Sequence, residues 1–326
     1  MEGIEEIKVT PIQFSIILPV YNVSDYLEQC MASLLPQLCD DTEIIFIDDG
    51  STDGSGALCD RYAQEFPAVF VFHQSNRGVA AARNEGVRRA RGAYILWVDP
   101  DDYVADDWLA TIRQEIGSYD MLFFDYVKCI DGACEESRYG RAPGDLSSDE
   151  FLYELSRDDA ITSVLWNKVI RTEAYLLHPF DEQLRSLEDY DVLYRIAAEQ
   201  KRIRYVCKCL YTYRILEGGL VRSLNLQIGY MCYQKSVERY NALISRISAP
   251  SRLGICLQAK GFLCKYYRCN MPPEWKNEAD ICRSAIAACY LELLFDRRLS
   301  ATDKLKYMFI RFSPIGRVYA RKKDKI

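Results

Sequence analysis

The first hundred residues alternate short apolar runs with amphipathic segments. Four continuous apolar runs have the length of buried strands and end in polar loop residues: 14–19, 43–47, 68–72 and 94–98. Three segments between them place apolar residues at helical spacing: 24–35, 53–66 and 79–90. This βαβαβαβ order predicts an α/β fold with a mostly parallel sheet and helices on both faces, so that ligands bind at the carboxyl ends of the strands.

The rest of the chain continues in mixed fashion and then becomes helical. Residues 107–116 are predicted to be helical and 120–128 to form a strand, with further helices near 150–157 and 188–200. From about residue 228 the pattern is helical, with breaks at Pro250 and at Pro272-Pro273. We therefore expect an α/β domain over residues 1–228 and a helical region over residues 229–326.

Composition limits the class of protein. With 326 residues and 49% hydrophobic content, the chain can bury a sizeable core. No run approaches the roughly 18 apolar residues of a spanning helix, so any membrane association is expected to be peripheral. The thirteen cysteines include no CxxC pair, and the start lacks the pattern of a signal peptide. A reducing, cytoplasmic setting is expected, with no structural zinc and with most cysteines acting as small buried hydrophobic residues.

Charge divides the chain into an acidic body and a basic tail. The net charge is -6, although residues 301–326 contain eight Lys and Arg against two Asp. An acidic body disfavours nucleic acid as a partner. Residues 303–326 combine apolar positions at helical spacing with these basic residues, which suits either an anionic membrane surface or a helix docked on the protein.

The acidic cluster Asp99-Pro100-Asp101-Asp102 directly follows the apolar run 94–98. Three carboxylates at a strand end repel one another unless a cation neutralises them, and Mg²⁺ or Mn²⁺ prefers such oxygen ligands while keeping positions for substrate phosphates. The alternative is a polar turn that caps the next helix. The cluster therefore has two interpretations, a divalent metal site and a polar turn.

Three further polar sites lie near predicted strand ends or helix starts. Asp49 follows the second strand, where one carboxylate can accept a hydrogen bond from a base or a ribose, whereas Ser51 and Asp53 suit an Asx turn and a helix cap. Arg83 could meet a diphosphate or hold carboxylates in place, unless it lies on an exposed helix face. Glu188-Asp189 precedes an amphipathic segment, where helix capping is the simplest explanation for acidic residues.

Four motifs taken together resemble the family 2 glycosyltransferases of the GT-A fold. They are Ser15-Ile-Ile-Leu-Pro-Val-Tyr-Asn22, Ile47-Asp-Asp-Gly-Ser-Thr-Asp53, Asn76-x-Gly through Ala82-Arg-Asn-Glu-Gly86, and Val98-Asp-Pro-Asp-Asp-Tyr103. Trp166-Asn-Lys168, Glu188-Asp189 and Tyr211-x-Tyr-Arg214 match later features of the family, so the resemblance covers about residues 12–225. Pro100 departs from the family, where a small polar residue is common.

The resemblance implies an inverting, metal-dependent transfer of a sugar from a nucleotide-sugar, with UDP favoured over GDP or dTDP, to an acceptor hydroxyl. Asp189 would be the catalytic base, with Glu188 as the alternative if the loop register differs, and Asp101 and Asp102 would hold the Mn²⁺ or Mg²⁺ ion. Nucleotide-sugar binding would fall to the following residues: Pro19, Tyr21, Asn22, Asp49, Asn76, Gly78, Arg83, Asp99 and Asp101. A lipid-linked saccharide in capsule or exopolysaccharide synthesis is the expected acceptor.

Other classes fit the sequence less well. A sugar-phosphate nucleotidyltransferase would need a glycine-rich phosphate loop after the first strand, where this chain has Pro19-Val-Tyr-Asn22. The missing GxGxxG at the same place gives no support to a dinucleotide-binding oxidoreductase. A non-catalytic nucleotide-sugar-binding subunit remains the main rival, and it predicts the loss of a base or a metal ligand.

Overall fold

A computed structural model describes residues 11–157, 161–184, 187–216, 225–243, 253–288, 294–295 and 304. Contacts divide the chain into two compact units. The first comprises Met1–Ser147 and Val164–Ile215, and the second comprises Ser148–Ser163 and Leu216–Ile326. The two units are described separately.

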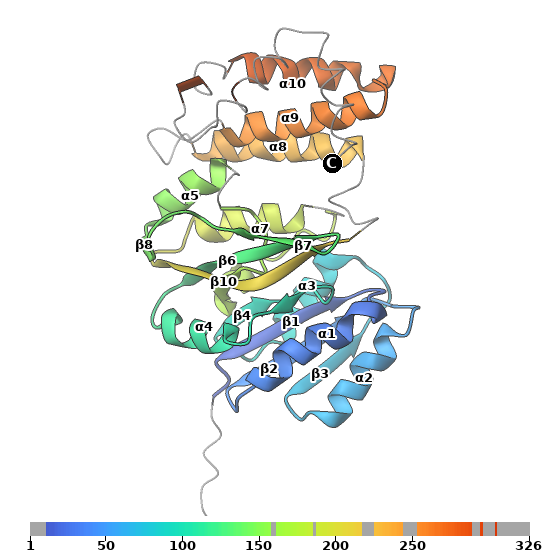
Figure 1. Cartoon of the computed structure of the whole chain (residues 1–326), viewed down its shortest axis with the longest axis vertical. Helices are drawn as coiled ribbons and strands as arrows, with labels where there is room; N and C mark the ends of the chain where they lie inside the picture. The colour runs from blue at the N-terminus through green and yellow to red at the C-terminus, as the bar shows by residue number, and fades with distance from the viewer. Residues whose placement is uncertain are drawn as a thin grey trace, which may run out of the picture. The chain divides into compact units, whose positions relative to one another are not determined.

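One mixed sheet forms the centre of the first unit (Figure 1). Its strands in the described residues are β1 (Phe14–Val20), β2 (Thr42–Asp48), β3 (Val69–His73), β4 (Tyr94–Trp97), β5 (Tyr103–Val104), β6 (Met121–Ile130), β7 (Ala133–Ser137), β8 (Gly144–Leu146), β9 (Lys168–Arg171) and β10 (Ile203–Ile215). They lie in the order β3-β2-β1-β4-β9-β6-β10-β5, while β7 pairs with β6 and β8 with β10. The first four strands in this order are parallel, and β9 is antiparallel to both neighbours, β4 and β6.

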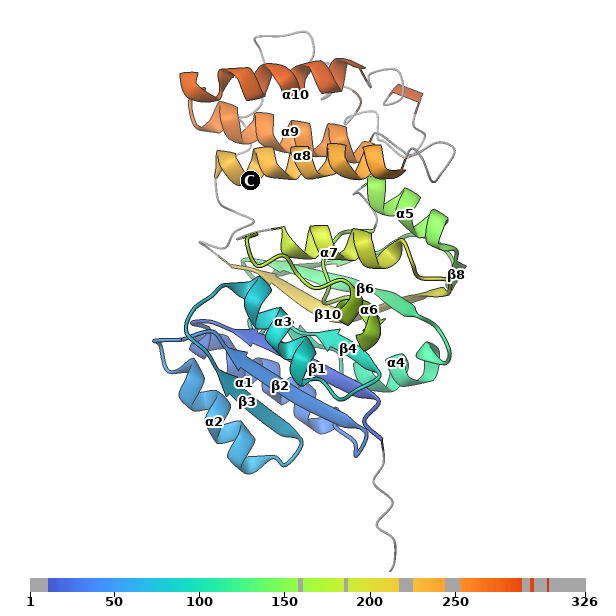
Figure 2. The ribbon, with the colours of Figure 1, turned by 180° about the vertical axis from the view of Figure 1, so that it is seen from behind.

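Helices cover both faces of this sheet. They are α1 (Ser24–Leu34), α2 (Ser55–Glu65), α3 (Val79–Arg89), α4 (Trp108–Ile116), α6 (Thr172–Leu177) and α7 (Glu188–Ala197), with a 3₁₀ turn at Leu35–Gln37. The buried side chains of α1, α2 and α4 join one hydrophobic core with the even-numbered residues of β1. The view from behind shows α3 on the opposite face (Figure 2).

The close packing of α3 on the sheet depends on Gly86. A Cβ atom at this position would lie 2.5 Å from Cγ2 of Ile17, a side chain of β1 that points away from the first core. Because a larger residue would clash there, glycine allows α3 to contact β1 and β2 directly. This contact fixes the start of α3, and with it the loop that precedes the helix, at the carboxyl edge of the sheet.

The second unit is helical within its described residues. It contains α5 (Ser148–Arg157), α8 (Leu226–Leu243), α9 (Leu253–Arg268), a 3₁₀ turn (Pro273–Trp275) and α10 (Lys276–Ala288). An aromatic-rich core that includes Tyr233, Phe262 and Tyr266 joins α8, α9 and α10, which lie side by side in both views (Figures 1 and 2). In the parts that the structure describes, no helix has the length and apolar character to cross a membrane.

The predicted α/β architecture is confirmed, since the βαβαβαβ order runs from β1 to β4 with parallel pairing of β1 to both β2 and β4. The predicted break at Pro272-Pro273 coincides with the 3₁₀ turn between α9 and α10, whereas Pro250 and most of the basic tail lie outside the described residues. The division at residue 228 stays a prediction. Contacts also assign α5 to the second unit, because it packs against α8 and α9.

The cysteines follow the expectation only in part. Of those that the structure describes as free, Cys30, Cys59, Cys256 and Cys282 are buried, and the others are at least partly accessible. Cys129 and Cys134 lie opposite each other on β6 and β7 and form a disulfide, which had not been expected. Strand pairing explains this contact, because only the hairpin brings the two residues together.

Candidate functional site

The predicted nucleotide-binding residues begin with Pro19 near the end of β1 and continue in the loop that follows. The amide nitrogen of Asn22 donates to Oγ of Ser51, and its side-chain Oδ1 accepts from the Thr52 amide at 2.8 Å. These bonds join the β1–α1 loop to the β2–α2 loop at the carboxyl edge of the sheet. Tyr21 precedes this junction and is 50% exposed, so its ring is available for stacking on a ligand.

Asp53 accepts hydrogen bonds from the first residue of each helix that follows these loops. Its Oδ1 accepts from the Ser55 amide at 3.0 Å, and its Oδ2 accepts from the Ser24 amide at 2.9 Å. Although burial would raise its pKa, these hydrogen bonds lower the pKa of the Asp53 carboxyl to about 2. Asp53 therefore makes the bond of the predicted Asx turn, whereas the N-cap residue of α2 is Gly54.

The buried Asp49 carboxylate organises the loop between β3 and α3. Oδ1 accepts from Nε2 of Gln74 at 2.7 Å and from the Arg77 amide at 2.8 Å, while Oδ2 accepts from the Gly78 amide at 2.8 Å. Asn76 lies in this loop and is exposed. Asp49 thus lies where the sequence placed it, after β2, and it also holds the loop that carries two other predicted binding residues.

Two glycines allow these loops to approach each other. Gly50 has a φ of 75°, and a Cβ atom there would lie 3.0 Å from the amide nitrogen of Asn76. Gly78 has a φ of 92°, a conformation that L side chains rarely adopt, and in it the Gly78 amide donates to Asp49. Glycine suits both positions because L side chains rarely adopt these φ angles, and at Gly50 the backbone of the neighbouring loop leaves little room for a Cβ atom.

The acidic turn after β4 contains three carboxylates in different surroundings. Asp99 has a side chain 31% exposed, Asp101 is partly buried, and Asp102 is fully buried. Burial raises the pKa of Asp99 to about 7, opposed by Arg83 and reinforced by Asp101 and by Asp189. Mutual repulsion among carboxylates is the electrostatic condition that favours a bound cation.

Asp102 points into the protein rather than toward solvent. Its Oδ2 accepts from the Tyr211 hydroxyl at 2.9 Å, and its Oδ1 accepts from the Arg214 amide at 2.7 Å. Burial, with Asp99 and Asp101 nearby, still raises the pKa of Asp102 well above its ordinary value. Burial raises the pKa of Asp101, and among the described residues no other residue forms a hydrogen bond or ion pair with its carboxylate.

Two residues of β10 complete the turn and were not assigned a role from the sequence. The Tyr211 hydroxyl accepts from the Asp99 amide at 3.0 Å while it donates to Asp102. The Arg214 guanidinium donates to the backbone oxygen of Asp101 and to Oε1 of Gln29, and it lies over the ring of Tyr26. The Tyr211-x-Tyr-Arg214 motif was the sequence signal for these two residues. Its contact with the acidic turn could not be predicted, because more than one hundred residues separate the two segments.

Arg83 is almost completely buried between Trp97 and Phe180, so the alternative of an exposed helix face is wrong. Its guanidinium forms an ion pair and hydrogen bond with Glu188, and lies 3.8 Å from Oδ1 of Asp99. Arg83 therefore connects α3, the end of β4 and the first turn of α7. Of the two predicted roles, this geometry supports holding carboxylates in place.

The neighbouring carboxylates Glu188 and Asp189 are not equivalent. Glu188 is buried against Arg83, whereas Asp189 is partly exposed, and its Oδ1 accepts from the amide of Tyr190 at 2.7 Å. Asp189 is close enough to Asp99 to raise the pKa of that carboxyl. Only Asp189 of this pair combines solvent access with proximity to the acidic turn.

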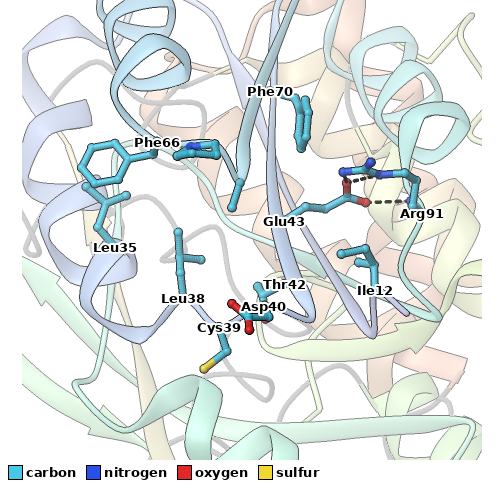
Figure 3. A pocket seen from close by; sticks show the side chains of 12 residues that line it. Ile12, Leu35, Leu38, Cys39, Asp40, Thr42, Glu43, Phe66, Phe70 and Arg91 are labelled. Atoms are coloured by element: carbon cyan, nitrogen blue, oxygen red, sulfur yellow. Dashed lines mark hydrogen bonds and ion pairs between the residues drawn. The ribbon is translucent and has the colours of Figure 1, made fainter. Parts of the chain in front are cut away.

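Two cavities border the sheet, at different distances from these residues. The first, of about 480 Å³, lies at the amino ends of the strands and includes Leu38, Phe66 and the buried Glu43, which pairs with Arg91 (Figure 3). No predicted site residue lines this cavity. The second, of about 510 Å³, is lined by Gln74 and Arg77 and therefore borders the loop that Asp49 holds.

The carboxylates fit a divalent cation of the kind that keeps few protein ligands. Among the residues that the structure describes, no group of three or more His, Cys, Asp or Glu side chains is arranged to hold a metal ion. Mg²⁺ typically uses one or two carboxylates together with substrate phosphates. A partly exposed Asp101 beside Asp99 provides such a partial set.

Solved structures with the same architecture are GT-A glycosyltransferases. A Staphylococcus aureus TarS fragment in complex with UDP-GlcNAc aligns with a TM-score of 0.62 and 18% identity, covering 96% of this chain and 92% of that one. The mannosyltransferase PcManGT from Pyrobaculum calidifontis, in complex with GDP-Man and Mn²⁺, aligns with a TM-score of 0.52 and 18% identity, covering 98% and 91%. The fold is therefore GT-A.

Sequence comparison identifies the family. The model of "Glycosyl transferase family 2" matches residues 15–166. Glycosyltransferase GlyG of Streptococcus pneumoniae is 31% identical over 229 residues, which cover 64% of this chain and 73% of GlyG. This chain belongs to glycosyltransferase family 2.

Other relatives extend beyond the matched region. The uncharacterized glycosyltransferase EpsJ of Bacillus subtilis is 32% identical over 212 residues, covering 61% of this chain and 60% of EpsJ. For glycosyltransferase GlyA of Streptococcus pneumoniae, 29% identity extends over 64% of this chain but only 32% of GlyA. The match with these proteins thus spans about one third to three fifths of their length.

Proposed function

We propose that this protein transfers a sugar from a nucleotide-sugar to an acceptor hydroxyl with inversion at the anomeric carbon. The observation that supports this most strongly is the convergence of Asp49, the acidic turn and the first turn of α7 at one edge of the sheet, with Arg83 linking Asp99 to Glu188. A donor site and a partly exposed carboxylate next to it are the two components that a single displacement needs.

Asp189 is the proposed catalytic base. It would accept the proton of the acceptor hydroxyl as the oxygen attacks the anomeric carbon, while the bond to the nucleoside diphosphate breaks on the opposite side of the sugar. Glu188 is poorly suited to this step because its carboxylate is buried against Arg83. Glu188 instead positions α7, and with it Asp189.

Asp101 is the proposed main ligand of a Mn²⁺ or Mg²⁺ ion. When bound, the ion supplies positive charge that stabilises the departing diphosphate. Asp102 was also predicted as a ligand, but its hydrogen bonds to Tyr211 and Arg214 support a role in shaping the turn around Asp101. Asp99 completes the acidic edge on the side of Arg83.

The other proposed contacts with the nucleotide-sugar are assigned from where each residue lies in the fold. Pro19 at the end of β1, with Tyr21 and Asn22 in the loop after it, would flank the nucleobase opposite Asp49, Asn76 and Gly78. We favour UDP as the nucleotide. The acceptor is proposed to be a lipid-linked saccharide of a cell-surface polysaccharide, met at the cytoplasmic face of the membrane. The basic segment 303–326 that would contact this membrane lies largely outside the described residues.

The test is calorimetric titration of UDP into the wild-type protein and into Asp101→Asn, with and without Mn²⁺. We expect metal-dependent binding that weakens at least about tenfold in Asp101→Asn, because one ligand carboxylate is lost. Asp106→Asn, an exposed change in the next loop, is the control. If the folded wild type binds no nucleoside diphosphate with metal present, the donor site is absent and the proposal fails.

Stereochemistry is tested separately. Once a panel of nucleotide-sugars has identified a donor by release of UDP, NMR of the product gives the anomeric configuration. Inversion supports a single displacement with Asp189 as base, whereas retention excludes it.

A further inference from the structure

The hydrogen bonds of Asp49 restrict what this carboxylate can still accept. Each carboxylate oxygen has two lone-pair positions. Oδ1 uses both, with Gln74 at 2.7 Å and the Arg77 amide at 2.8 Å, whereas Oδ2 uses one, with the Gly78 amide at 2.8 Å. Among the described residues nothing else donates to Asp49, so one position remains, on Oδ2.

We propose that Gln74 is a specificity-determining residue, which limits the nucleobase site to bases that present a single ring N–H to Asp49 and thereby excludes guanine. This inference rests on the proposed function, in which Asp49 receives the base. The two structural neighbours share this fold but were solved with different nucleotide-sugars, UDP-GlcNAc and GDP-Man.

The chemistry of the bases makes the distinction. Uracil and thymine have one ring donor, N3–H, flanked by two carbonyl oxygens, so a single acceptor position satisfies it. Guanine presents N1–H and the 2-amino group side by side, and a carboxylate recognises them with both oxygens. With Oδ1 saturated, one guanine donor would be left without a partner beside a residue that is only 4% exposed, which costs binding free energy.

Of the three groups that bind Asp49, only Gln74 acts through its side chain. The Arg77 and Gly78 amides are backbone groups, and Gly78 is held in its left-handed conformation. The Gln74 amide directs its NH₂ group at Oδ1 of Asp49. Gln74 also lines the 510 Å³ cavity, whose lining does not include Asp49.

Removing the Gln74 donor should raise the affinity for GDP relative to that for UDP. In Gln74→Met the side chain keeps its length but donates nothing, so Oδ1 regains one acceptor position that a guanine amino group can use. Water entering from the cavity could occupy that position, but guanine can displace it. A purely structural role for Gln74 would weaken all nucleotides together, whereas the proposed role improves GDP relative to UDP.

The experiment is calorimetric titration of UDP, dTDP and GDP with Mn²⁺ into the 326-residue wild type, Gln74→Met and Gln74→Ala. We expect the wild type to bind UDP and dTDP at least about tenfold more tightly than GDP. In both variants, the ratio of UDP affinity to GDP affinity should fall by about tenfold. Arg89→Ala is the matched control, because Arg89 lines the same cavity without contacting Asp49, and its ratio should equal the wild-type ratio.

The outcomes separate this inference from the proposed function. If the wild type binds GDP as tightly as UDP, or if the folded variants keep the wild-type ratio, the role of Gln74 is overturned while nucleotide binding stands. If no nucleotide binds, both fail. If both variants fail to fold, the ratio of UDP affinity to GDP affinity in the wild type alone decides whether the inference stands.

Discussion

The guanidinium of Arg83 pairs with the carboxylate of Glu188 across 105 positions of sequence, inside the first unit. Both side chains are less than a tenth exposed, and the rings of Trp97 and Phe180 lie on the guanidinium. The pair fastens the start of α7 to α3, so Asp189, the next residue along, is kept beside the acidic turn.

Substitution of Arg83 by Met should destabilise the protein strongly. It leaves Glu188 buried without its partner, which typically costs about 3 to 5 kcal/mol. We expect this loss in the free energy of urea unfolding, and partial recovery in Arg83→Met combined with Glu188→Gln. A loss below about 1 kcal/mol in the single variant would show that Glu188 finds another partner.

Substitution of Asp189 by Asn should remove catalysis while donor binding is kept. The amide cannot accept the proton of the acceptor hydroxyl, so kcat should fall by about a hundredfold to ten-thousandfold. Titration with UDP and Mn²⁺ should give the wild-type affinity, because the side chain is outside the nucleotide contacts. Asp181→Asn, an exposed change ahead of α7, serves as the control. Full activity in Asp189→Asn would exclude this residue as the base.

Tyr211→Phe and Tyr213→Phe form a matched pair, since both rings stack on Trp166. Only the Tyr211 hydroxyl bridges Asp102 and the Asp99 amide, so its loss leaves buried groups without a partner. We expect Tyr211→Phe to be less stable by about 1 to 3 kcal/mol and to bind UDP with Mn²⁺ more weakly. Thermal unfolding and titration of both variants measure the difference, and equal effects would contradict the assigned bridge.

His73 should make stability depend on pH. Nδ1 lies 2.8 Å from Oδ2 of Asp48 and Nε2 lies 3.1 Å from Oδ1 of Asp60, and these hydrogen bonds raise the pKa of His73. A raised folded-state pKa stabilises the protein fully below the unfolded value of about 6.5, and the contribution disappears as pH rises through the folded-state pKa.

The matching measurement compares urea unfolding of the wild type and His73→Gln between about pH 5 and pH 9, on either side of the ordinary histidine value. The wild type should be the more stable protein at the acid end, with the gap narrowing toward the alkaline end. The same gap at every pH would mean that His73 contributes through packing and neutral hydrogen bonds alone.

Several parts of the site could be predicted from local sequence. Apolar runs ending in Pro19, Ile47 and Val98 mark strands whose carboxyl ends share an edge, because parallel strands align in direction. The polar residues after those strands therefore had to lie near one another. Glycine at Gly50 and Gly78 likewise marks tight loops, since few other residues adopt their backbone conformation.

The sequence by itself determined the order of strands and helices, the edge that carries the polar loops, and the motifs of the family, because these depend on local hydrophobic period and turn chemistry. Tertiary structure alone decided which carboxylates are buried and which stay accessible. Asp102 differs from Asp101, and Glu188 from Asp189, only through Tyr211, Arg214 and Arg83, which arrive from distant elements. The environment of a carboxylate is set by the residues that pack against it, and the neighbouring sequence does not predict which residues these are.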